Sequence, residues 1–227
     1  MNNTEKFSGK ATVYAQARPS YPHAAIDYIC KFITPDSVVA DIGAGTGKFT
    51  ELLAKRNYNM FAVEPNSDMH EQLEITLKSF PNVKIINSTA EATTLPDNSV
   101  DLITVAQALH WFDPDKFRAE CRRIGKENVR VIAIYNQTPG GSSVGHSKLS
   151  TDVFFENPTI REFPNSVFYT REKWIQYMTS HSHDPLPTDP NYETHIAEAN
   201  AIFDKENENG LLRRDVMTKV YSEDFEV

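Results

Sequence analysis

Residues 38–53 read VVADIGAGTGKFTELL, and this stretch decides the fold. An apolar run ends in an acid, a glycine-rich turn follows, and apolar residues at helical spacing come next. A strand, a tight turn and a helix in this order form the unit with which an α/β protein builds a nucleotide-binding edge. The stretch therefore predicts such an edge.

The spacing of the glycines narrows the kind of ligand. A dinucleotide-binding turn would need a glycine at Lys48, and a phosphate-binding P-loop would need glycine at Ile42 and Ser or Thr at Phe49. None of these is present. Asp41 also ends the strand where its carboxylate would repel a pyrophosphate. A ligand that combines a ribose with a cationic amino acid suits this site better, and S-adenosylmethionine (SAM) is such a ligand.

Composition limits the size of the fold and the kinds of partner. The chain has 227 residues, which suit one α/β domain with an elaboration, or a domain plus a small lobe. Its net charge is −8 and its basic residues are scattered, which disfavours RNA or DNA as a substrate. The densest basic group, at 118–130, is interleaved with Glu120 and Glu127 and is interpreted as a solvated helix face.

Neither a metal site nor a membrane segment is expected. Cys30 and Cys121 make no disulfide framework or metal pattern, and His181 and His183 have no evident third ligand. Residues 1–6 are polar and do not resemble a signal peptide. Because no run approaches the roughly 18 apolar residues of a membrane helix, we expect a cytoplasmic protein.

Strand and helix patterns alternate from residue 38 onward. The predicted strands are 38–42, 60–63, 83–86, 100–105 and 129–135, and the predicted helices between them are 48–56, 68–79 and 113–124. This alternation is typical of a parallel sheet covered on both faces. Beyond residue 136 we expect helices at 171–180 and 192–205, and a late strand at 215–221 on an edge of the sheet.

Acidic and apolar residues after the second and third strands suit an adenosine ligand. Glu64 ends the second strand, where an acid can accept both ribose hydroxyls, and Met69 follows where it can cover the adenine. Ala90 and Glu91 follow the third strand, where a backbone N–H and a carboxylate can meet the ring and its amine. The alternatives are a core position for Met69 and a helix-terminal acid for Glu91.

Two further segments are candidates for the acceptor side of the site. Gln107, His110 and Trp111 follow the fourth strand, beyond whose carboxyl end ligands meet. His110 is expected either to act as a general base or to orient the acceptor. The alternatives are a histidine bonded to the backbone beneath a lid, and packing of Trp111 on the following helix. Tyr14 and Arg18 are four residues apart before the sheet, and Arg18 can bind a carboxylate. Surface decoration is the equal alternative for this pair.

Several stretches together correspond to the motifs of one family. They are 41–47 (DIGAGTG), 63–66 (VEPN), 90–91 (AE), 95–96 (LP) and 100–103 (VDLI). With them, the chain resembles class I SAM-dependent methyltransferases of the type 11 domain group. The stretches 106–112 (AQALHWF) and 14–22 (YAQARPSYP) are similar to the small-molecule, trans-aconitate methyltransferase-like branch.

The resemblance implies an α/β fold. This is a Rossmann-like, seven-stranded, mostly parallel sheet with helices on both faces, a reversed final hairpin and a C-terminal lid or small lobe. The expected division is a cap segment at 1–34, a SAM-binding core at 35–137, a lid or acceptor-binding insertion at 138–210, and a final strand at 211–227.

The residue patterns and the resemblance together predict two sets of site residues. The cofactor set is Asp41, Gly43, Ala44, Gly45, Gly47, Glu64, Pro65, Met69, Ala90, Glu91, Gln107 and Trp111. The catalytic set is His110, Arg18 and Tyr14.

The expected activity is transfer of the SAM methyl group to a small-molecule acceptor, a carboxylate or a hydroxyl, by in-line displacement. Two alternatives stay open: a methyltransferase that acts on a protein or RNA, and a SAM-binding sensor without catalysis. The sequence does not indicate the oligomeric state.

Overall fold

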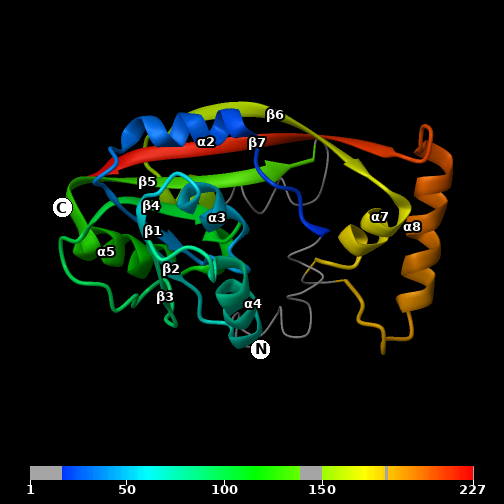
Figure 1. The fold of residues 1–227 in the computed structure, drawn as a ribbon, viewed down its shortest axis with the longest axis horizontal. Coiled ribbons are helices and arrows are strands. Elements are labelled where there is room, and N and C mark those ends of the chain that lie inside the picture. Colours follow the sequence, from blue (N-terminus) through cyan, green and yellow to red (C-terminus); the bar gives the residue numbers. More distant parts are fainter. Residues whose placement is uncertain (1–16, 139–149, 182–183, 227) are drawn as a thin grey trace.

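The computed structural model describes residues 17–138, 150–181 and 184–226. Its described part contains one seven-stranded sheet with the strand order β3-β2-β1-β4-β5-β7-β6 (Figure 1). The strands are β1 (Val38–Ile42), β2 (Asn59–Val63), β3 (Val83–Ile86), β4 (Val100–Ala106), β5 (Gly125–Gln137), β6 (Thr159–Tyr169) and β7 (Leu212–Phe225). The helices are α2 (His23–Ile29), α3 (Lys48–Ala54), α4 (Ser67–Leu77), α5 (Pro114–Ile124), α7 (Arg171–Met178) and α8 (Tyr192–Glu206), with short 3-10 turns η2 (Cys30–Phe32) and η3 (Leu109–Trp111). The predicted Rossmann-like fold class is confirmed.

The strand directions correct two expectations about the end of the chain. Strands β1 to β5 are parallel, β7 is antiparallel to β5, and β6 is antiparallel to β7. Only β7 is therefore reversed, rather than a whole hairpin. The late strand at 215–221 lies inside the sheet, and β6 forms the edge. The edge position of β6 fits Pro164, because a proline removes a backbone donor that a central strand needs.

Apolar side chains that alternate along the strands pack against helices on both faces. On one face, α2 and α3 cover the strands through Ile26, Ile29, Phe49, Leu53, Val39, Leu102 and Ile132. On the other face, α5 packs through Phe117, Cys121, Ile124, Ala40, Ile103, Val105 and Val131. This alternation is the period of two that a strand buried on both faces shows.

Two helices begin at capped ends beside the carboxyl edge of the sheet. The Asn66 side chain accepts a hydrogen bond from the backbone N–H of Met69 at 2.9 Å and caps α4. The Asp113 carboxylate accepts from the Lys116 N–H at 3.2 Å and caps α5, with Pro114 at the first helical position. Such caps satisfy donors that a helix leaves open at its start. They fix where each helix leaves the strand end.

Helices α7 and α8 form a small lobe at one end of the molecule (Figure 1). They pack on the ends of β6 and β7 through Tyr169, Trp174, Ala199, Phe203 and Leu212. The indole N–H of Trp174 donates to the Ala199 carbonyl at 2.9 Å, which ties the two helices together. The lobe and β6 both fall within the region 138–210 that the sequence assigns to a lid. Within the described residues, no helix is long and apolar enough to cross a membrane.

Candidate functional site

The glycine turn between β1 and α3 lies across the end of β2. The backbone N–H groups of Gly43 and Ala44 both donate to the Val63 carbonyl, at 2.9 and 3.0 Å. Gly43 and Gly45 have φ angles of +69° and +57°, a left-handed conformation that favours glycine. Gly47 is the N-cap of α3. The turn is thus fixed at the carboxyl edge of two neighbouring parallel strands, where open α/β sheets bind ligands.

Glu64 joins this turn from the end of β2. One carboxylate oxygen accepts from the Gly45 N–H at 2.8 Å, and the other accepts from the Asn66 N–H at 2.9 Å. The side chain is 7% exposed. Burial raises the pKa of Glu64, and the two N–H bonds oppose that rise. Because an ionised carboxylate has about four lone-pair sites, Glu64 keeps acceptor capacity for a ligand hydroxyl. Pro65 next to it is half-buried.

Asp41 lies at the end of β1 and is fully buried. Its two carboxylate oxygens accept from the hydroxyl groups of Thr50, at 2.5 Å, and Thr104, at 3.0 Å. These bonds link β1 to α3 and β4. Burial raises the pKa of Asp41 to about 7, because neutral hydroxyl donors only partly replace water around the charge. The structure thus gives Asp41 an internal structural role, and its contact with a cofactor stays a prediction.

The loop after β3 is attached to both ends of α5. Ala90 is buried, and Glu91 accepts a hydrogen bond from the Asp113 N–H at 3.0 Å. This contact places Glu91 at the start of the helix, as the alternative interpretation of a helix-terminal acid expects.

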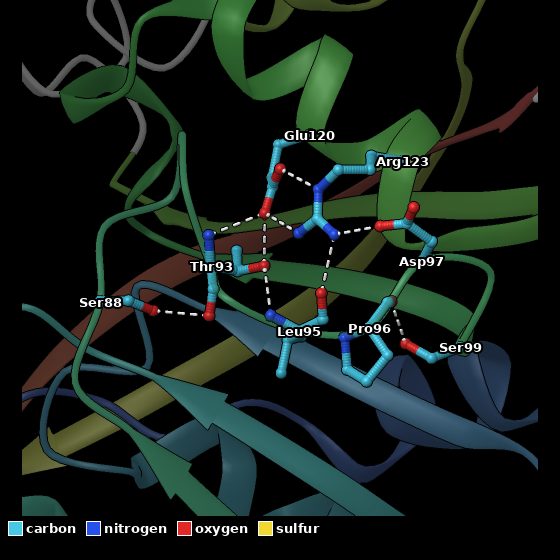
Figure 2. A network of polar contacts seen from close by, with 8 residues as sticks. All are labelled: Ser88, Thr93, Leu95, Pro96, Asp97, Ser99, Glu120 and Arg123. Carbon is cyan, nitrogen blue, oxygen red and sulfur yellow. Dashed lines mark hydrogen bonds and ion pairs between the residues drawn. The ribbon is translucent and has the colours of Figure 1, made fainter.

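The second attachment of the loop is a network around Glu120 and Arg123 (Figure 2). One Glu120 oxygen accepts from the N–H of Thr93 at 2.7 Å and from its hydroxyl at 2.5 Å. Arg123 donates to both Glu120 oxygens, at 2.8 and 2.7 Å, and to the Leu95 carbonyl at 2.8 Å. Glu120 is 7% exposed, so the expectation of a solvated helix face was wrong for this residue. A buried carboxylate needs such partners because isolated burial of its charge is costly.

The segment after β4 brings aromatic rings together. Gln107 has a φ of +61°, and its backbone N–H donates a hydrogen bond to the carbonyl oxygen of Ile134 at 3.0 Å. The His110 ring centroid lies 4.4 Å from that of Trp111 and 6.4 Å from that of Tyr135. Both His110 and Trp111 are partly buried. The structure therefore holds these two predicted site residues in direct contact.

Two further predicted residues, Met69 and Arg18, lie apart from each other in the structure. Met69 is a buried residue of α4. Arg18 contacts the lobe: its guanidinium donates to the Ser180 carbonyl at 3.4 Å and lies 5.7 Å from the centre of the Tyr177 ring. Tyr14 lies outside the described residues.

Sequence reasoning missed the hydroxyl groups that hold Asp41 and the network of Glu120. Thr104 interrupts the apolar strand at 100–105, and a polar side chain in such a strand indicates a buried partner. Glu120 carries no such signal, because its spacing from Arg123 is also that of an exposed helix pair. Within the described residues, which exclude His183, no group of three or more His, Cys, Asp or Glu residues could hold a metal ion.

We predict that Gly43→Ala destabilises the fold more than Gly45→Ala. Both substitutions place a side chain at positive φ, which costs roughly 1–2 kcal/mol. A Cβ at Gly43 would lie 2.8 Å from the Ala108 Cβ and 2.9 Å from Phe112, whereas a Cβ at Gly45 meets nothing within 4 Å. The overpacking should add roughly 1–3 kcal/mol for Gly43→Ala. Urea denaturation measures both, and equal losses would contradict the packing argument.

We predict that the stabilisation that Asp41 gives to the folded state declines as the pH rises. Its folded pKa, about 7, lies above the ordinary value of 3.8, so the folded state holds the proton more tightly than the unfolded state. The resulting stabilisation is complete below 3.8 and is lost as the pH rises toward 7. Asp41→Asn should flatten this part of the curve of unfolding free energy against pH. An unchanged slope in the variant would show that other groups produce it.

Glu120→Gln should lower the free energy of unfolding by roughly 1–3 kcal/mol, because it weakens buried hydrogen bonds and leaves Arg123 without its buried counter-charge. Asp97→Asn is the matched control, since Asp97 also pairs with Arg123 but is 70% exposed. Asp97→Asn should change the free energy of unfolding by no more than roughly 0.5 kcal/mol. Chemical denaturation of both variants measures the difference, and equal effects would remove the special role of Glu120.

Part of the chain is similar in sequence to known methyltransferases. Residues 40–133 match the family model described as the methyltransferase domain. An uncharacterized methyltransferase of Mycobacterium tuberculosis is 37% identical over 130 residues, which are 57% of this chain and 51% of that protein. The chain thus spans about half the length of the curated relatives it matches.

Solved structures share the fold. A putative type II methyltransferase from Anaeromyxobacter dehalogenans superposes with a TM-score of 0.65 at 20% identity, covering 92% of this chain and 97% of that one. A SAM-dependent methyltransferase from Aquifex aeolicus gives a TM-score of 0.52 at 19% identity, covering 69% and 88%. Residues 40–133 therefore match a methyltransferase domain model, and the chain shares its fold with these solved methyltransferases.

Proposed function

We propose that the protein transfers the methyl group of SAM to a small-molecule acceptor, as in the trans-aconitate methyltransferase-like branch that it resembles. One observation carries the proposal: the glycine turn and the Glu64 carboxylate are hydrogen-bonded at the adjoining ends of β1 and β2. Both lie within the methyltransferase domain at 40–133.

The residues at this edge fit the cofactor. The space beside Gly45 is open, since a Cβ there would meet nothing within 4 Å. Glu64 keeps lone pairs that can accept ribose hydroxyls. The adenine would lie near Ala90 and Glu91, and the methionine end near the glycine turn and Trp111.

The protein contributes mainly by positioning. When bound, SAM supplies an electrophilic methyl group on a sulfonium leaving group. The surrounding residues must hold the nucleophilic atom of the acceptor in line and exclude water, which can lower a barrier by roughly 7–11 kcal/mol. A carboxylate acceptor needs no base at neutral pH, whereas a hydroxyl would pass its proton to His110.

Charge and architecture support a small acceptor. The net charge of −8 opposes a phosphate backbone as the substrate. Residues 138–210 would form the lid over the acceptor pocket. Arg18, which lies against the end of α7, would be the lid-side cation of that pocket.

Glu64→Gln should weaken binding of SAM and of its product S-adenosylhomocysteine (SAH). Loss of hydrogen bonds to a charged acceptor costs about 1.5–3 kcal/mol, which corresponds to roughly a tenfold to hundredfold rise in Kd. Glu71→Gln, at an exposed position of α4, is the control and should leave Kd unchanged. Titration calorimetry measures both, and a wild-type protein that binds neither compound would overturn the proposal.

Turnover separates the enzyme from a sensor. Release of SAH from SAM should be measured with a panel of small carboxylic acids, phenols and amines. Turnover with a small acid or phenol is the expected result. Tight SAM binding without turnover on this panel, or turnover only with a protein or RNA, would contradict the small-molecule assignment.

A further inference from the structure

The Asn136 side chain joins the segment before α2 to the ends of three strands. Asn136 is the next-to-last residue of β5, and its amide NH2 group donates to the backbone carbonyls of Pro19, at 3.4 Å, and Ser20, at 3.2 Å. Its amide oxygen accepts from the Thr218 hydroxyl at 2.5 Å and from the Asn165 NH2 group at 3.3 Å. One amide group therefore connects the segment with β5, β6 and β7.

The chemistry of the partners fixes the orientation of this amide. Because carbonyl oxygens only accept hydrogen bonds, the NH2 group of Asn136 must be the end that faces Pro19 and Ser20. Its oxygen then faces the hydroxyl and the second amide, so each end of the amide has partners. Asn165 repeats the contact, since its NH2 group also donates to the Ser20 carbonyl, at 2.9 Å. We call Asn136 and Asn165 together the amide latch.

The sequence explains why a polar side chain is needed at this point. Ile132 and Ile134 of β5 pack on the side of α2, and Asn136 is the next residue on the same face of the strand. The segment opposite it, at 18–21, is not helical, and its proline cannot continue a helix. Its backbone carbonyls therefore need partners outside a helix, and the amide latch supplies them.

The same segment is also attached beside the glycine turn. The Tyr21 ring packs edge to face on the Phe49 ring of α3, with 5.2 Å between the ring centroids. The ammonium group of Lys48, the first residue of α3, donates to the Arg18 carbonyl. Helix α3 follows β1, whereas the amide latch lies on β5 and β6, and β4 lies between β1 and β5 in the sheet. Residues 17–22 thus connect the two sides of the carboxyl end of β4.

The residue that follows β4 completes this arrangement. The Gln107 side chain donates to the backbone carbonyl of Asn136 at 3.5 Å. Asn136 therefore contacts a predicted cofactor residue through its backbone and the segment 17–22 through its side chain.

We propose that Asn136 is a positioning residue that, with Asn165, holds residues 17–22 closed over the cofactor edge and so slows release of the bound cofactor. This inference rests on the proposed function and adds to it a control of ligand exchange. Hydrogen bonds between neutral groups are individually weak. A few of them hold the segment in place during the reaction and still let it open when the product leaves.

Two substitutions of nearly unchanged shape separate the latch from the sheet. Asn136→Asp keeps the oxygen that accepts from Thr218, but it replaces the NH2 group by an oxygen that repels the carbonyls of residues 19 and 20. Thr218→Val is the matched control, because it removes the hydroxyl on the sheet side and leaves the contacts with the segment. Asn165→Ala removes the second amide of the latch.

The dissociation rate of SAH, measured by stopped-flow fluorescence, is the main readout. It should be roughly tenfold higher in Asn136→Asp, as expected for loss of two hydrogen bonds, higher to a smaller extent in Asn165→Ala, and unchanged in Thr218→Val. Hydrogen exchange of residues 17–22, measured by mass spectrometry, should be faster in the first two variants only.

Equal SAH dissociation rates in Asn136→Asp and the wild type would overturn the proposal. So would an equal increase in Thr218→Val, which would assign the effect to the sheet, or faster exchange of 17–22 without faster release, which would show that the segment does not cover the cofactor edge. Binding of SAH to the wild-type protein, measured first, tests the proposed function separately. Thermal melting checks folding, and Asn165→Ala, at a half-buried position of the edge strand, keeps the test decisive if Asn136→Asp does not fold.

Discussion

The hydrogen bonds between the glycine turn and the end of β2 are the constraint on which the rest of the site depends. Gly43 and Ala44 donate to Val63, and Gly45 donates to the Glu64 carboxylate. These bonds require β1 and β2 to be neighbours, parallel and aligned at their carboxyl ends. They also provide acceptors for the backbone N–H groups of the turn, which would otherwise be unpaired. The same contacts therefore fix both the fold at this edge and the shape that it presents.

Three carboxylates of the domain are buried, two at this edge and one on α5, and the chemistry of their partners sets their protonation. Among the described residues, Asp41 accepts from hydroxyl groups and Glu64 from backbone N–H groups, and burial raises the pKa of both. Glu120 is also buried, but the Arg123 guanidinium and Thr93 hold its pKa below the usual value. A cation stabilises the ionised form more strongly than neutral donors do. Glu120 can thus act as a fixed anion that anchors a loop.

The sequence predicts those parts of the fold that depend on local patterns. The five parallel strands, the helices between them and the glycine turn arise from short-range periodicity and turn chemistry, and all were found. The order of the last strands was not predictable in this way. Pairing of β6 with β7 joins Tyr169 to Leu212 across an intervening pair of helices. Most of the β6 side chains are exposed or half-buried, so the strand has little apolar alternation to mark it.

The site shows the same division between local and non-local signals. Glu64 could be placed because it ends a predicted strand at a fixed distance from the turn. The structural role of Asp41 could not be predicted from the sequence, since its partners Thr50 and Thr104 come from other elements. The pairing of Lys48 with the Arg18 carbonyl likewise joins residues on separate segments. Spacing along the chain carries no information about such contacts.

The long pair β6–β7 explains how the lobe is placed relative to the site. The last residue of β5, Gln137, pairs with Met217, while β7 begins earlier, at Leu212, and stays paired with β6 as far as Tyr169. Because β7 is antiparallel to β5, this extension projects beyond the carboxyl edge of the parallel strands, toward α7 and α8 (Figure 1). The lobe is thus attached through a continuous backbone ladder. A one-residue slip would turn every side chain of the ladder to the opposite face, so the register of β6 on β7 fixes which side chains of the two strands pack against α7 and α8. The hydrogen bonds of the glycine turn involve only β1, β2 and the residues that follow them, so they do not depend on this ladder.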